Sequence, residues 1–276
     1  MPELPEVETI RRVITPQLCG QTITRVELLS PHVAAYPAAA EFSARLTGQI
    51  FTSSCRRGKF MRFTLQSGDT LTLHLRMTGG LVVLPASEAP EPHTHLILHL
   101  SGGSALHFID QRKFGRFWLL RADEEDTITG MHKLGPEPSD PAVTGAYLQS
   151  HLHASHRAVK EALMDQSLIA GIGNIYSDEI LHAARIHPAT PCCALVETDF
   201  NRIAALIPER MAYFVEKNAI TPEDYLITRG REYRNTPYLQ VYGRKGQPCR
   251  ICGAPIEKRT IGGRGSHYCP VCQKAP

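Results

Sequence analysis

The sequence predicts an α+β multidomain fold in which a β-rich N-terminal domain precedes a helical domain and a small cysteine-bearing module. Three observations support this prediction. Alternating apolar and polar stretches separated by turn residues run from residue 22 to about 120, helical composition runs from 146 to 226, and four of the eight cysteines fall between 249 and 272. The 276-residue length suffices for about two domains of ~100–200 residues each.

Residues 3–18 are expected to form a helix ahead of the β-rich region. Pro5 suits the first turn of a helix, and Glu6 and Glu8 favour the positive end of its dipole. Apolar residues at helical spacing predict one buried stripe, formed by Leu4, Val7, Ile10, Val13 and Ile14.

The N-terminal domain, residues 2–134, is predicted to be a β-sandwich, although the alternation by itself also allows a barrel-like layer. Residues 67–69 and 101–104 are placed to form hairpin turns, and the Pro/Ala/Glu-rich residues 85–93 are expected to form a mobile loop. The expected strands are Phe60–Leu65, Thr70–Leu75, Leu81–Leu84, His95–Leu100, Ala105–Ile109 and Arg116–Leu120.

Residues 135–145 carry three prolines and are expected to form the interdomain linker. A helical domain is predicted over 146–237, and the cysteine-bearing module over 238–276. The expected helices are Ala146–His153, Arg157–Met164, Asn174–Ala184, Glu197–Asn218 and Pro222–Leu226.

Positive charge is concentrated at the C-terminal end. Residues 227–276 hold ten Lys/Arg and two acidic residues, a net charge of +8. The whole chain has a net charge of +3, so the other 226 residues have a net charge of −5. A basic module on a mildly acidic body is typical of nucleic-acid binding, although a solvated basic surface has the same composition.

The cysteine pairs Cys249-x2-Cys252 and Cys269-x2-Cys272 predict one structural zinc site. Two paired knuckles can surround Zn²⁺ with four thiolates and leave no open position for water.

The start of the chain carries acidic residues where a secretory leader would be basic and then apolar, and no apolar run reaches ~18 residues. We therefore expect a cytoplasmic location, no membrane partner, and reduced cysteines that bind metal. Cys19, Cys55, Cys192 and Cys193 lack such spacing and are expected to be packing residues.

Between the two cysteine pairs, residues 258–265 are expected to form a hairpin tip with three cations. Gly263 and Gly265 flank Arg264 and would let the backbone approach a phosphate closely. A solvated turn is the alternative; the zinc support and the charge density favour DNA.

The N-terminus offers a chemical group of its own. Methionine before proline is normally removed, which would leave Pro2 with a free secondary amine. An α-amino group titrates near 8, and the positive helix end would lower that pKa further, so much of the amine is neutral. A neutral secondary amine can attack a sugar carbon and form an iminium, with Glu3 and Glu6 placed to carry protons. Pro and Glu are also ordinary residues of a first helical turn.

Several collinear motifs resemble those of the bacterial formamidopyrimidine-DNA glycosylases, a family shared with endonuclease VIII. The first is Pro2-Glu3-Leu4-Pro5-Glu6-Val7-Glu8, and the last is the cysteine module after Val241-Tyr242-Gly243. Between them stand Arg57-Gly58-Lys59-Phe60, His74-Leu75-Arg76-Met77-Thr78-Gly79, Asp110-Gln111-Arg112-Lys113-Phe114-Gly115 and Gly171-Ile172-Gly173-Asn174-Ile175-Tyr176. The likeness spans nearly the whole chain.

The resemblance implies a helix–two-turn–helix element in the helical domain and a β-hairpin zinc finger at the end. It implies that Pro2 is the nucleophile, that Glu3 is the general acid/base, and that Glu6 helps to hold the extruded nucleotide. Lys59 and Arg264 would belong to the catalytic set that contacts DNA, with His74 and Asn174 gripping phosphates around the lesion. Met77, Arg112 and Phe114, with Lys113 between the last two, would fill the gap left by the flipped base, where the wedge offsets a few kcal/mol of lost stacking.

The implied activity is that of a bifunctional DNA glycosylase and abasic-site lyase, acting as a monomer on double-stranded DNA with damaged bases or abasic sites. It would excise oxidised purines, 8-oxoguanine and formamidopyrimidines, and cut the strand by β,δ-elimination through a Schiff base on Pro2. Two other functions stay open: an endonuclease VIII-like glycosylase for oxidised pyrimidines, and a noncatalytic zinc-finger protein that binds lesions. The combination of Met77, Arg112 and Phe114 favours a formamidopyrimidine glycosylase over an endonuclease VIII-like glycosylase. A pure binder has no need of an amine beside a carboxylate.

The chain departs from the family pattern at four places. Gln111 replaces a usual proline, Lys113 replaces a usual arginine, and Arg76 stands where glycine is common. Residues 227–239 do not match the loop that covers an oxidised purine, so their extra arginines could bind phosphate, bind the lesion or be solvated.

Overall fold

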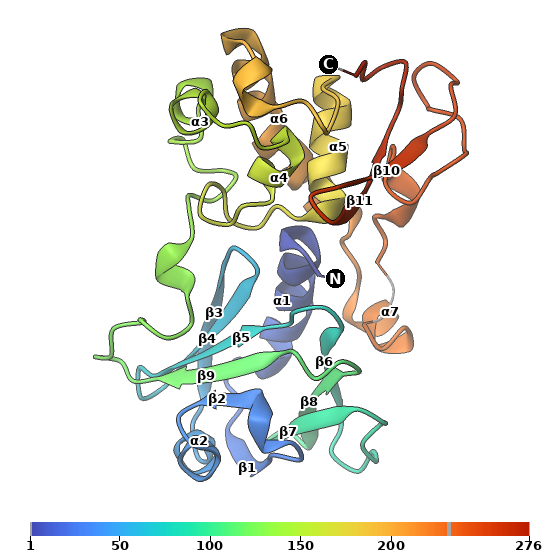
Figure 1. Ribbon diagram of the computed structural model, residues 1–276. Coiled ribbons are helices and arrows are strands. Elements are labelled where there is room, and N and C mark those ends of the chain that lie inside the picture. The colour runs from blue at the N-terminus through green and yellow to red at the C-terminus, as the bar shows by residue number, and fades with distance from the viewer. Residues whose placement is uncertain (1, 231–232, 276) are drawn as a thin grey trace. The chain divides into compact units, whose positions relative to one another are not determined.

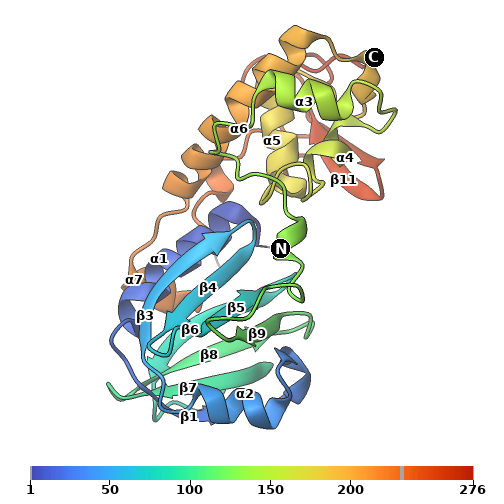
Figure 2. The same cartoon turned by 90° about the vertical axis from the view of Figure 1, so that its left-hand side faces the viewer.

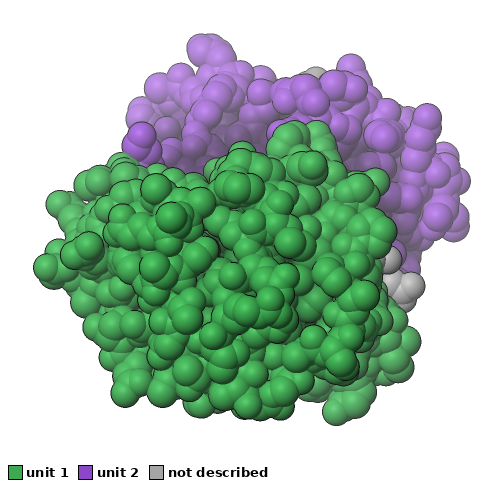
Figure 3. Space-filling view, turned by 90° about the horizontal axis from the view of Figure 1, so that it is seen from below, with its two compact units in different colours: residues 1–132, 218–234 green, residues 133–217, 235–276 purple. Residues whose placement is uncertain are grey.

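The computed structural model describes residues 2–230 and 233–275, which form two compact units (Figure 3). Unit 1 comprises residues 1–132 and 218–234, and unit 2 comprises residues 133–217 and 235–276. Residues 218–234, expected at the end of a helical domain over 146–237, therefore group with the N-terminal residues. The reason is Tyr225, which is buried in the core of unit 1 and donates its hydroxyl to the carbonyl oxygen of Leu81 at 2.7 Å.

Unit 1 contains two sheets that share one core. The five-stranded sheet has the order β2-β9-β5-β4-β3, and the four-stranded sheet has the order β1-β7-β8-β6. Phe108 and Phe117 come from different sheets and meet edge to face with ring centroids 5.0 Å apart. The strands are β1 Ile23–Glu27, β2 Ala34–Tyr36, β3 Phe51–Arg57, β4 Phe60–Leu65, β5 Thr70–His74, β6 Gly79–Pro85, β7 Thr94–Leu100, β8 Ser104–Asp110 and β9 Arg116–Leu120. The predicted sandwich and its six predicted strands are confirmed.

Helix α1 Leu4–Leu18 packs against β3, β4 and β6 (Figure 2). All five residues of the predicted stripe, Leu4, Val7, Ile10, Val13 and Ile14, are buried. Unit 1 also contains α2 Ala39–Leu46 and α7 Pro222–Ile227. The sequence pattern does not predict α2, because this helix is only two turns long and lies within a strand-rich region.

Unit 2 consists of helices followed by a hairpin (Figure 1). The helices are α3 Gly145–Leu152, α4 Val159–Leu163, α5 Asn174–Ala184 and α6 Glu197–Lys217, and the hairpin pairs β10 Glu257–Ile261 with β11 Arg264–Tyr268. Short 3-10 turns occur at Pro31–Val33, Met131–Lys133, Cys192–Ala194 and Thr236–Tyr238. Among the residues that the structure describes, no helix is long and apolar enough to span a membrane.

Candidate functional site

The first turn of α1 fixes two carboxylates directly after Pro2. Pro2 is buried, and Glu3 and Glu6 are each 1% exposed. The Glu3 backbone N–H donates to Oε2 of Glu6 at 2.8 Å, and the Glu3 carboxylate accepts from the Glu6 backbone in return. This reciprocal capping box, together with the positive end of the helix dipole, holds both acids in place.

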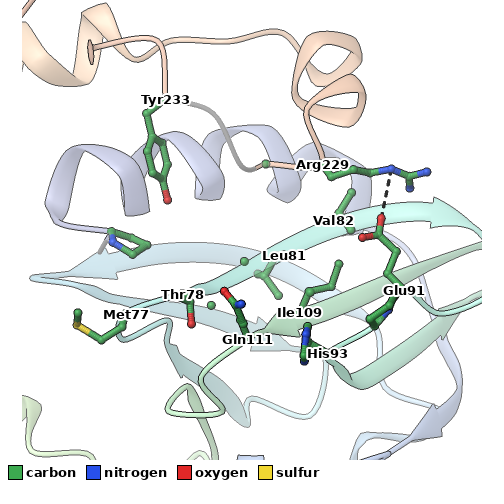
Figure 4. A pocket seen from close by; sticks show the side chains of 15 residues that line it. Met77, Thr78, Leu81, Val82, Glu91, His93, Ile109, Gln111, Arg229 and Tyr233 are labelled. Atoms are coloured by element: carbon green, nitrogen blue, oxygen red, sulfur yellow. Dashed lines mark ion pairs between the residues drawn. The ribbon is translucent and has the colours of Figure 1, made fainter.

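Pro2 also lines a cavity of about 610 Å³ within unit 1. Met77 and Tyr233 lie toward one end of this cavity, and Arg229 and Glu91 lie toward the other (Figure 4). The remaining lining residues come from β6, β8 and nearby loops: Thr78, Gly79, Gly80, Leu81, Val82, Pro92, His93, Ile109, Gln111 and Gly230. The cavity is in the size range of about 300–1,000 Å³ that is typical of small-molecule sites.

The loop after β8 presents Arg112 and Phe114 to solvent. Buried Asp110 organises it, since its carboxylate accepts from the Thr78 hydroxyl, from the Arg112 backbone N–H at 3.2 Å and from the Gly115 backbone N–H at 2.8 Å. The Arg112 guanidinium carbon lies 4.6 Å from the centroid of the Phe114 ring, which is 46% exposed. The structure therefore brings together two residues of the predicted wedge as one stacked pair.

Two of the departures from the family pattern have left-handed backbone conformations. Arg76 and Lys113 both have φ of 58°. Such a conformation favours glycine, so glycine would suit the position of Arg76. Gln111, the third departure, contributes an exposed side chain to the cavity lining.

His74 is held as a neutral hydrogen-bond donor. Its Nδ1 accepts the Arg76 backbone N–H at 2.9 Å, and its ring packs edge to face on Phe60 with centroids 4.6 Å apart. Burial, followed by the positive charges of Arg76 and Lys59, lowers the pKa of His74 to about 3. The proton of the neutral ring therefore sits on Nε2. Lys59 is 8% exposed and lies in the β3–β4 turn, where Gly58 has φ of 54°.

In unit 2, Asn174 and the hairpin that carries Arg264 are joined. The Asn174 side-chain amide donates to the carbonyl oxygen of Gly265 at 3.2 Å. Lys160 and Asp178 form a buried ion pair, with Nζ and Oδ1 2.7 Å apart. This pair stabilises the hairpin, because Asp178 Oδ2 also accepts the His267 backbone N–H at 2.8 Å. Arg264 itself is exposed.

The cysteines Cys249, Cys252, Cys269 and Cys272 form one cluster, with all four sulfur atoms within 4.8 Å of one another. The sulfurs of Cys252 and Cys269 are 3.4 Å apart, and those of Cys249 and Cys272 are 4.0 Å apart. A tetrahedral site with Zn–S bonds of about 2.3 Å has sulfurs about 3.8 Å apart, so the donor set fits zinc. Burial opposes ionisation of Cys249, but hydrogen bonds from the backbone N–H groups of Cys252 and Ile251 and from the thiols of Cys269 and Cys252 outweigh it and lower the pKa of this thiol to about 7.

Three of the cavity residues are not predicted individually from the sequence: Arg229, Glu91 and Tyr233. The available signal was the excess of arginines over 227–239. Within that segment Arg229 pairs with Glu88 and Glu91, and Arg234 pairs with Asp224 at 3.0 Å. Arg231, like Met1, lies outside the described residues.

Comparison with known proteins decides the family. Family models match the formamidopyrimidine-DNA glycosylase N-terminal domain over residues 1–117, its H2TH domain over 134–224, and the zinc finger found in FPG and IleRS over 246–275. A formamidopyrimidine-DNA glycosylase from Pelotomaculum thermopropionicum is 42% identical over 274 residues, which cover 99% of each chain. The chain belongs to the formamidopyrimidine-DNA glycosylase family.

Solved structures of this family agree with the fold. Lactococcus lactis FPG (MutM) in complex with FAPY-dG-containing DNA superposes with a TM-score of 0.90 at 33% identity, covering 99% of this chain and 100% of that one. A complex of Lactococcus lactis Fpg with abasic-site DNA gives a TM-score of 0.91 with the same coverage. The predicted fold class and family resemblance are confirmed.

Membership of the formamidopyrimidine-DNA glycosylase family makes this protein a DNA-repair glycosylase with the abasic-site lyase activity characteristic of that family. The zinc-finger match covers all four clustered cysteines, so the module is the family's zinc finger and the predicted zinc cofactor is confirmed. The noncatalytic binder is therefore excluded.

Proposed function

We propose that Pro2, once Met1 has been removed, is the nucleophile for excision of oxidised purines from double-stranded DNA. Its nitrogen forms a bond to C1′ as the bond from C1′ to the base breaks, and the base leaves with the bonding electrons and takes up a proton. Opening of the sugar ring then gives a protonated Schiff base. Loss of a 2′ proton expels the 3′ phosphate, and a second elimination expels the 5′ phosphate.

The observation that carries this proposal is the joint position of Pro2 in the cavity lining and at the start of a capped helix. The buried carboxylates of Glu3 and Glu6 follow it directly. Glu3 serves as the general acid/base for the leaving base and the ring oxygen, and Glu6 holds the extruded nucleotide.

The proposed contacts with DNA follow from hydrogen-bond donors and positive charges that suit a phosphate. Neutral His74 offers its Nε2 proton to a phosphate, and Lys59 supplies positive charge at the sugar-phosphate backbone near it. Asn174 and Arg264, joined through Gly265, grip a phosphate from unit 2.

The wedge is formed by Met77, Arg112 and Phe114, and Lys113 contacts the DNA beside it. The stacked guanidinium and ring of Arg112 and Phe114 fill the space of the flipped base and meet the opposite base. The protein acts as a monomer, in the cytoplasm and on the nucleoid, where its DNA substrate is found and where zinc-bound thiols stay reduced.

Oxidised purines are the proposed substrates because Lactococcus lactis Fpg has been solved on DNA containing Fapy-dG. The same relative has also been solved with oxidised-pyrimidine-containing DNA, which keeps the endonuclease VIII-like preference as the second candidate. Excision rates on 8-oxoguanine:C and thymine-glycol duplexes discriminate the two; faster turnover of thymine glycol would reject the purine preference.

Borohydride trapping tests the nucleophile. The processed enzyme, checked by intact mass for loss of Met1, is expected to form a covalent adduct with abasic-site DNA. A matched protein with an uncleavable residue ahead of Pro2 is expected to bind the same DNA without trapping or cutting it. Full cleavage by that blocked protein would contradict the role of Pro2. A Pro2→Gly variant, whose primary amine lacks the proline ring, is expected to bind abasic-site DNA and lose cleavage.

A further inference from the structure

Helix α5 presents one face to the cysteine module. Asn174, Asp178 and His182 are spaced four residues apart, so their side chains lie on the same side of the helix. The Asn174 side chain donates to the Gly265 carbonyl at 3.2 Å, and Asp178 accepts the His267 backbone N–H at 2.8 Å. Both contacts are made to the hairpin, so the module packs on this face of the helix.

On the same face, His182 reaches the sulfur of Cys249. Its Nε2 lies 3.7 Å from Cys249 Sγ, and the two residues are only 2% and 3% exposed. This separation suits an N–H···S hydrogen bond, which is longer than a bond to oxygen because sulfur is larger. A zinc-bound thiolate carries no proton and can only accept, so the imidazole must donate from Nε2. We propose that His182 is a positioning residue of the zinc site, which donates this hydrogen bond to the Cys249 thiolate and thereby helps to retain the metal.

The backbone that leads to Cys249 is also fixed on α5. Glu179 is buried, and its carboxylate accepts three backbone N–H groups from residues 240–242, at 2.8 to 2.9 Å. Arg244 donates to a carbonyl oxygen of that segment at 2.6 Å and to the carbonyl oxygen of Pro248, the residue before Cys249, at 2.9 Å. These contacts set the position of the sulfur against the helix.

The donor matters because the zinc site is an anion. The charge of four thiolates exceeds that of one Zn²⁺ ion, and a partly buried negative charge is stabilised by charge-assisted hydrogen bonds. Cys249 accepts the Ile251 backbone N–H at 3.5 Å, and Cys269 likewise accepts the Cys272 backbone N–H at 3.4 Å. Those donors belong to the cysteine pairs themselves, whereas His182 supplies a donor from outside the module. An apolar side chain in its place would leave the thiolate buried with one donor fewer and weaken zinc binding.

The zinc affinity of the purified full chain tests the inference. His182→Leu removes the donor, whereas His182→Gln keeps an N–H close to the place of the histidine Nε2. Competition with a coloured chelator gives the affinity, and we expect His182→Leu to bind zinc roughly 10–100-fold more weakly than wild type does. His182→Gln should stay close to wild type. An unchanged affinity in His182→Leu would overturn the inference, and so would a loss in His182→Gln as large as that in His182→Leu.

His187→Leu is the matched control, because it removes another buried histidine of unit 2 that packs on the module. The His187 ring contacts Tyr268 with centroids 4.4 Å apart, and its Nδ1 accepts the Ala189 backbone N–H at 3.2 Å. This variant should bind zinc nearly as tightly as wild type does. A loss equal to that of His182→Leu would assign the effect to packing and overturn the inference.

Cobalt substitution reports on the hydrogen bond itself. Co²⁺ in place of zinc gives a thiolate-to-metal charge-transfer absorption, whose energy rises when a donor stabilises the sulfur electrons. We expect this absorption to move to longer wavelength in His182→Leu and to stay in place in His187→Leu; an absorption that does not move in His182→Leu would overturn the inference. Both measurements are made without DNA, so their outcome is independent of the proposed chemistry at Pro2.

Discussion

The two units fix their functional side chains by different means. In unit 1, Glu3 and Asp110 are held by backbone hydrogen bonds on elements that pack on a large apolar core. Among the described residues of the cysteine module in unit 2, a small cluster of buried hydrophobic residues is formed by Val241, Cys249, Ile256 and Cys269. A site that rests on a core tolerates loss of one polar contact, whereas a site that rests on a metal depends on a single bond set.

Removal of zinc should give the largest effect, and it should change unit 2 without changing unit 1. Chelation is expected to abolish lesion binding and strand cleavage, because the hairpin with Arg264 loses its support. Trp118 is the single tryptophan and lies in β9 of unit 1, so its fluorescence should stay unchanged. Cleavage by a zinc-free preparation, verified by metal analysis, would contradict the contrast between the units.

Glu3→Gln should leave both units folded and impair the chemistry. Glutamine still accepts the backbone N–H of Glu6, so the cap is kept while the proton carrier is lost. We expect the single-turnover excision rate to fall by roughly 10²–10⁴-fold, with DNA affinity unchanged. Glu8→Gln, which loses only ion pairs with Arg11, Arg12 and Arg56, serves as the control and should excise at nearly the normal rate.

Lys160→Met should show that unit 2 also depends on a buried charge pair. It leaves the Asp178 carboxylate buried without its cation, and we expect the free energy of unfolding, measured in urea, to fall by about 3–5 kcal/mol. The double variant Lys160→Met/Asp178→Asn is expected to recover most of this loss, since asparagine still accepts the His267 N–H. A double variant as unstable as the single one would show that packing, not charge, is responsible.

The smallest effect concerns pH and His74. Its folded pKa of about 3 lies below the ordinary value of 6.5, so below pH 6.5 the unfolded chain binds a proton that the folded chain excludes. The free energy of unfolding is therefore highest above pH 6.5 and decreases as the pH falls, by about 1 kcal/mol near pH 5.5. His74→Gln should therefore lose less Tm between pH 7.5 and 5.5 than wild type does; equal losses would mean that His74 titrates normally.

Sequence periodicity predicted the elements that are long or strongly patterned, such as α5, and the spacing of four cysteines predicted the zinc site. It predicted the helix α7 but not that this helix belongs to unit 1, because a six-residue helix carries too little pattern to show which core it joins. The pairing of Arg229 with Glu88 joins residues 141 positions apart, and no local rule predicts such a contact. The proximity of Glu3 and Glu6 to Pro2 was predictable, because these residues lie within one helical turn of one another; their roles in the chemistry stay predictions.

The stacking of Arg112 on Phe114 has a kinetic consequence. Side chains that are loose before an encounter lose roughly 0.5–1.5 kcal/mol each when a partner orders them, and here that ordering precedes contact with DNA. If this pair is the wedge that we propose, its two side chains lose less conformational freedom on entering the duplex than two separate side chains would. Insertion of the wedge at each base step should then be faster.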